Sequence, residues 1–131
     1  MTIVVGYVPK PEGRAALVAA LEEADLRGES LHVLNTSKGD AYSDPGYATE
    51  DDLAEVKALL EESGVPYELE HRLGDQAGGA ADILEAVERL SASLVVIGIR
   101  RRTPTGKLLF GSDAQTVLLH APCQVLAVKA G

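Results

Sequence analysis

The chain alternates short apolar runs with longer segments whose apolar residues recur at helical spacing, and this alternation restricts the fold more than any other feature. Most of the short runs are largely apolar, which favours strands buried on both faces of a parallel sheet. In residues 65–71, apolar and polar residues alternate around Pro66, as in an edge strand with one wetter face. We expect strands at residues 3–8, 31–34, 65–71, 94–97 and 125–128.

Helix boundaries are marked by residue types that begin or end helices. Pro11 suits a first helical position, and Gly28 and Gly64 suit helix ends. Thr49 and Asp52 resemble a capping box at the start of a second helix. We expect helices from Pro11 to Gly28, from Thr49 to Gly64, after Gly79 as far as Leu90, and from Ser112 to His120, with a long loop over residues 35–48.

Strands that alternate with helices predict a single α/β domain over residues 1–131. The expected architecture is a five-stranded parallel sheet with helices on both faces and right-handed crossovers. With the strand order 3-2-1-4-5, the order reverses between the first and fourth strands. Ligands of such sheets bind beyond the carboxyl ends of the strands at that reversal. We therefore expect a crevice walled by residues 7–10 and 98–102.

Charge and composition exclude several functional classes. The net charge of −8 argues against binding to nucleic acid or to an anionic membrane surface, which requires a broad basic surface. No apolar run approaches the roughly 20 residues of a membrane span, and the N-terminal residues do not resemble a signal peptide. The single Cys123 excludes an internal disulfide and is interpreted as a small buried residue in a reducing compartment. These features predict a cytoplasmic protein.

Residues 94–112 combine three features that favour phosphate binding. An apolar strand leads into Gly98, Gly106 adds backbone freedom, and Gly111 with Ser112 opens a helix whose first amides can meet an anion. Several basic residues and no acidic ones lie between Gly98 and Gly111, although the chain as a whole is acidic. The basic residues are Arg100, Arg101, Arg102 and Lys107.

Each of these features has a second interpretation. The basic run is also explained by a solvated loop or by contacts to a second subunit, and Gly111 with Ser112 by a plain helix cap. Arg101 can pair with a phosphate through its guanidinium group. Alternatively, its bulk fills space through which a glycine would let a phosphate approach. The sequence leaves these alternatives open.

No catalytic constellation is apparent. The segment TPTGKL is not a phosphate-binding P-loop, because Arg101 holds the position of the required upstream glycine. The three histidines are far apart in sequence and lack the spacing of metal ligands. We expect structural or surface roles for His32, His71 and His120.

The last strand predicts self-association. Under the expected order it is an edge strand, yet it is apolar on both faces, and such an edge pairs readily with another chain. A two-fold dimer joined through this strand would cover it. The alternative is an edge half-hidden by the fourth helix. The residues concerned are Val125, Leu126, Ala127 and Val128.

Several segments resemble the universal stress protein family. ATP-binding members carry the motif Gly-x2-Gly-x9-Gly-[Ser/Thr] after the fourth strand, and Gly98, Gly111 and Ser112 match it in spacing. The segments IVVGYVPKPEGRAAL, LHVL and APCQVLAVK also look like this family, so the resemblance covers the whole chain. It implies a Rossmann-like fold of the adenine nucleotide α-hydrolase type. Arg101 replaces the second glycine of the motif, and Val8 replaces an aspartate that holds the ribose.

The resemblance implies that the ligand is ATP or a related adenine nucleotide, either alone or with Mg²⁺, and that the backbone of Val33 meets the adenine ring. The first hypothesis is a homodimeric stress-response protein that signals through nucleotide occupancy, with at most slow, incidental hydrolysis. The second, supported by Val8 and Arg101, is a family member that has lost ATP binding and acts as an interaction or chaperone-like module. An enzyme of the wider adenine-binding superfamily is disfavoured, because SGGxDS-type, HIGH and KMSKS signatures are lacking.

Overall fold

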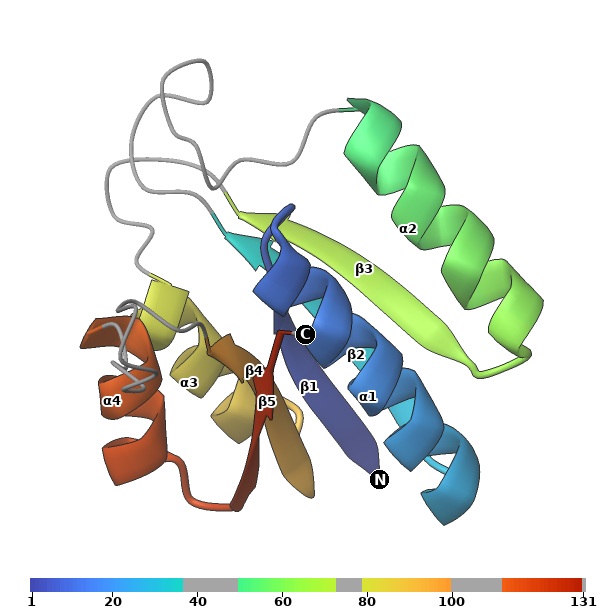
Figure 1. The fold of residues 1–131 in the computed structure, drawn as a ribbon. Helices are drawn as coiled ribbons and strands as arrows, with labels where there is room; N and C mark the ends of the chain where they lie inside the picture. The colour runs from blue at the N-terminus through green and yellow to red at the C-terminus, as the bar shows by residue number, and fades with distance from the viewer. Residues whose placement is uncertain (37–49, 73–78, 100–111, 131) are drawn as a thin grey trace.

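A computed structural model describes residues 1–36, 50–72, 79–99 and 112–130. Five parallel strands and four helices alternate along these residues (Figure 1). The elements are β1 (Thr2–Tyr7), α1 (Pro11–Arg27), β2 (Ser30–Thr36), α2 (Glu50–Ser63), β3 (Tyr67–Arg72), α3 (Gly79–Arg89), β4 (Leu94–Ile99), α4 (Ser112–His120) and β5 (Gln124–Lys129).

The sheet has the order β3-β2-β1-β4-β5, with every pairing parallel, which confirms the predicted fold class. Register places Val5 between Val33 and Val96, so β1 forms the centre of the sheet. Helices α1 and α2 lie on one side of the sheet, and α3 and α4 on the other (Figure 1). The strand order therefore reverses between β1 and β4, as predicted.

Alternate residues of the central strands feed two hydrophobic cores. Ile3, Val5 and Tyr7 of β1 face α1 and α2, whereas Val4 faces α3 and α4. All four are at most 1% exposed, because this strand is covered on both sides. Because both faces of this strand are buried, a polar side chain on either face would lose its contact with water. This explains the nearly continuous apolar sequence of the strand.

Helix α1 begins and ends at the residues that the sequence indicated. Pro11 occupies the start of the helix, where its missing N–H removes no intrahelical bond. Gly28 adopts the left-handed conformation (φ 66°) at the C-terminal end. The backbone N–H groups of Gly28 and Glu29 donate to the carbonyls of Asp25 and Ala24, at 3.4 and 3.0 Å. For α2, Gly64 ends the helix at φ 74°, whereas Thr49 of the predicted capping box lies outside the described residues.

Strand β3 is an edge strand with one wetter side, as expected from its alternating sequence. It begins at Tyr67, two residues later than predicted, after the buried Val65. Glu68 is exposed, and the Glu70 carboxylate accepts a hydrogen bond from Arg89 of α3 at 2.8 Å. The contact between Glu70 and Arg89 joins this edge of the sheet to α3.

Strand β5 is the other edge, and the helices on both sides reach it. Leu126 and Val128 pack partly against the core beneath α1, and Val125 and Ala127 pack partly against the core beneath α3 and α4. All four side chains are half-buried. This agrees with the alternative of a partly hidden edge, and association through β5 stays a prediction.

None of the described helices is long and apolar enough to cross a bilayer.

Cys123 is half-buried, not fully buried as the sequence suggested. It lies between α4 and β5 and packs partly against the core beneath α3 and α4. Burial raises the pKa of the Cys123 thiol, and backbone hydrogen bonds of Cys123 and Val95 lower it by less.

We expect the alkylation of Cys123 by iodoacetamide to show a pH midpoint above that of glutathione. The thiolate is the nucleophile, and a raised pKa moves its formation to higher pH. The rate of the folded protein should be measured from pH 6 to 10, with the urea-unfolded protein as the control. The control should titrate like an ordinary thiol. A folded-state midpoint at or below that of glutathione would contradict this prediction.

Candidate functional site

A cavity of about 200 Å³ lies at the carboxyl ends of β1 and β4, where the strand order reverses. Its apolar side chains come from β2, α3, β4 and α4, whereas the turn between β1 and α1 forms the opposite wall. This is the crevice that the topology predicts. Its principal apolar residues are Leu34, Ile83, Ile97, Ile99, Ala114 and Val117.

The turn between β1 and α1 folds tightly onto the first turn of α1. The backbone N–H of Lys10 donates to the carbonyl of Val8 at 2.8 Å. A Cβ atom at Gly13 would lie only 1.9 Å from that same carbonyl oxygen, so the close approach requires glycine. This packing places both Val8 and Glu12 in the cavity wall.

Gly98, one of the predicted site residues, lines the cavity. A Cβ atom at this position would lie 2.2 Å from the carbonyl oxygen of Glu12 and 3.1 Å from its Cβ. The glycine is therefore required by the approach of α1 to β4, whatever ligand the cavity holds. Sequence reasoning had connected Gly98 only with a ligand.

The first turn of α4 meets the cavity through Ala114. Ser112 is the first residue of this helix, as predicted. The first N–H groups of a helix have no intrahelical partner, and the helix dipole is positive there. The cavity is thus bounded at one end by a helix terminus suited to an anion. Four predicted residues, Arg100, Arg101, Gly106 and Gly111, lie outside the described residues.

Val33 is not among the residues that line the cavity. Its side chain is fully buried in the core beneath α1 and α2, and its neighbour Leu34 points to the other side and lines the cavity. Successive strand residues face opposite sides of a sheet, which explains the difference. The predicted contact of the Val33 backbone with adenine stays a prediction.

Polar side chains also gather at this end of the sheet on the α1 and α2 side. Tyr7 is 1% exposed, and burial raises the pKa of its phenol; Arg14 opposes this shift, while Asp52 and Glu55 add to it. Asn35 Nδ2 lies 3.1 Å from His71 Nδ1. Tyr7 further lines a smaller cavity of about 120 Å³ between α1 and α2.

Two histidines contact other side chains of the sheet, and the third is exposed. His32 is 4% exposed, and its Nε2 lies 2.7 Å from the Glu70 carboxylate, while His71 contacts Asn35. His120 is exposed at the end of α4. Across the described ranges, no group of three or more histidine, cysteine, aspartate or glutamate side chains is arranged to hold a metal ion.

The fold and the site define a parallel α/β protein with a cavity at the switch point of its sheet. The model of the universal stress protein family matches residues 1–129. A universal stress protein from Mycolicibacterium smegmatis is 47% identical over 127 residues, covering 97% of this chain and 96% of the relative. The chain belongs to the universal stress protein family.

Solved structures of this family have the same fold. A universal stress protein from Archaeoglobus fulgidus is 31% identical with a TM-score of 0.75, and 98% of each chain is covered. Another structure from the same organism, solved in complex with dAMP, is 26% identical with a TM-score of 0.69 and the same coverage. These likenesses extend over nearly the whole of this chain.

Proposed function

We propose that this universal stress protein binds an adenine nucleotide, ATP or a related one, in the cavity between β1 and β4. The observation that carries the proposal is the position of the cavity, at the switch point of the sheet and against the first turn of α4. The Archaeoglobus fulgidus relative in complex with dAMP supports the same ligand class.

The chemistry of the wall suggests how the ligand lies. The apolar side chains of Leu34, Ile83 and Ile97 offer a surface for the adenine ring. The start of α4 at Ser112 would then receive the phosphate. From the sequence, Arg100 and Arg101 would add charge there, Gly106 and Gly111 would let the backbone approach, and Mg²⁺ would accompany a polyphosphate.

We propose binding without efficient catalysis. Of the described side chains that line the cavity, the ionisable ones are Tyr7 and Glu12. Neither forms a nucleophile and base pair with another residue of that wall, so a positioned general base for hydrolysis is not identified there. The protein would signal through nucleotide occupancy, and any turnover would be slow and incidental.

We also propose a homodimer through β5. Within the described sheet, β5 pairs with β4 alone, so its outer backbone groups are available to a second chain. The half-buried Val125, Leu126, Ala127 and Val128 would become more covered on pairing.

Native mass spectrometry of the purified protein tests ligand and assembly together. We expect a dimer that carries an adenine nucleotide, or that takes one up when ATP and Mg²⁺ are added at millimolar concentration. A monomer would contradict the β5 proposal. A protein that stays empty under these conditions would contradict nucleotide binding.

A second candidate function is favoured by Val8. This apolar side chain lines the cavity where related ATP-binding members carry an aspartate for the ribose, and valine cannot accept a hydrogen bond. A dimer that stays empty with ATP and Mg²⁺ would indicate an interaction or chaperone-like module.

A further inference from the structure

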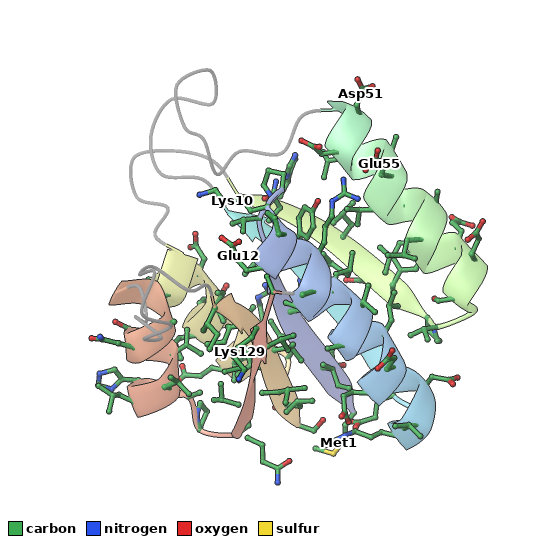
Figure 2. The ribbon with its side chains drawn as sticks, in the orientation of Figure 1. Met1, Lys10, Glu12, Asp51, Glu55 and Lys129 are labelled. Carbon is green, nitrogen blue, oxygen red and sulfur yellow. The ribbon has the colours of Figure 1, made fainter. Side chains whose placement is uncertain are left out.

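Glu12 is a charged residue of the cavity wall whose backbone packs closely against β4. It belongs to the first turn of α1 and lines the cavity. Figure 2 shows its side chain at the start of α1. A Cβ atom added at Gly98 would lie 3.1 Å from the Cβ of Glu12. The carbonyl of Glu12 packs against the same glycine. The base of the side chain is therefore fixed.

The carboxylate of Glu12 is available to a ligand. Within the described residues, Glu12 makes no hydrogen bond or ion pair, and it is partly exposed. Tyr7, the other described lining residue with a side-chain oxygen, packs its ring into the opposite core beneath α1 and α2. Glu12 is thus the side-chain hydrogen-bond acceptor that the described wall offers from the cavity side.

A bound nucleoside needs such an acceptor. The ribose of an adenine nucleotide has hydroxyl groups that donate hydrogen bonds, and leaving a buried donor unpaired is costly. The side chain of Val8 cannot accept a hydrogen bond from a hydroxyl group, and the other lining side chains named above are aliphatic. The negative charge of Glu12 also disfavours a phosphate on this wall, which directs the phosphate towards the start of α4.

We propose that Glu12 accepts a hydrogen bond from a ribose hydroxyl and selects nucleotides that carry one. This role rests on the proposed nucleotide binding. It assigns to the first turn of α1 the contact that Val8, four residues earlier, cannot make. Glu12 is then a specificity-determining residue of the cavity.

The test compares AMP with 2′,3′-dideoxy-AMP in calorimetric titrations of the wild type, Glu12→Ala and Glu12→Gln. We expect the wild type to prefer AMP by about tenfold or more, as for a hydrogen bond to a charged group. Glu12→Ala should bind the two ligands about equally, and Glu12→Gln should keep part of the preference. Because both ligands carry the same charge, the ratio of affinities cancels the general electrostatic effect of removing a carboxylate.

Glu22→Ala is the matched control, since Glu22 is an exposed glutamate of the same helix outside the cavity. It should keep the wild-type preference, and thermal melting should show that all variants are folded. If the wild type binds AMP but does not prefer it, or if Glu12→Ala keeps the full preference, the role of Glu12 is overturned while nucleotide binding stands. A wild type that binds neither AMP nor ATP overturns both proposals.

Discussion

Alanine in place of Gly98 should destabilise the fold by about 3 kcal/mol, at the upper end of the usual cost of overpacking. The added Cβ would lie 2.2 Å from the carbonyl oxygen and 2.6 Å from the carbonyl carbon of Glu12. Both of these atoms belong to the backbone of α1, and the added Cβ is bonded directly to the backbone of β4, so no side-chain rotation relieves the overlap. Thermal unfolding followed by circular dichroism should show a fall in Tm of about 10 °C for a domain of this size.

Gly28→Ala is the control for this substitution. Nothing lies within 4 Å of a Cβ at Gly28, but its φ of 66° is unfavourable for alanine. Its cost should be about 1 kcal/mol, the penalty of the left-handed conformation. If Gly98→Ala proves no more destabilising than Gly28→Ala, α1 does not approach β4 as closely as described.

The second large effect should follow from Ala114→Phe, which fills the cavity from α4. Ala114 lies in the first turn of this helix and lines the cavity. A phenyl ring there would occupy space proposed for the nucleotide. We expect the affinity for AMP and ATP to fall at least about tenfold, which corresponds to about 1.4 kcal/mol, while the fold is kept. Calorimetric titration measures the loss.

Gln115→Phe provides the matched control, because Gln115 is the next residue of α4 and is exposed. The same aromatic ring is then added outside the cavity, and the affinity for both nucleotides should be unchanged. Equal affinity of the two variants would place the nucleotide elsewhere on the protein.

Much of the fold follows from the amino-acid pattern, because local interactions carry it. Pro11 begins α1 and Gly28 ends it, each through its own backbone conformation. The alternating residues of β3 indicate an edge strand. The position of the crevice also follows, since strand order and handedness determine where the order reverses.

The residues of the site were predicted less completely. Glu12 was missed, although its position next to Pro11, close to the predicted switch point, was a usable signal. Val33 was chosen on the family resemblance for its backbone, and that contact stays a prediction. Its side chain lies in the other core, and Leu34 lines the cavity, because successive strand residues face opposite sides of the sheet. Cys123 was expected to be buried, but its position just before an edge strand leaves it half-buried.

Gly98 shows most clearly the difference between what the sequence indicates and what only the tertiary structure determines. Its spacing to Gly111 and Ser112 is visible in the chain, and it correctly marks the segment that borders the cavity. The reason for a glycine at this position is the carbonyl of Glu12, which lies 86 residues earlier and reaches β4 only when α1 packs on the sheet. Secondary structure and topology depend on local conformational preferences and on hydrophobic patterning. The contacts of Gly98 and Glu12 depend on distances between packed backbones, which a linear pattern does not contain.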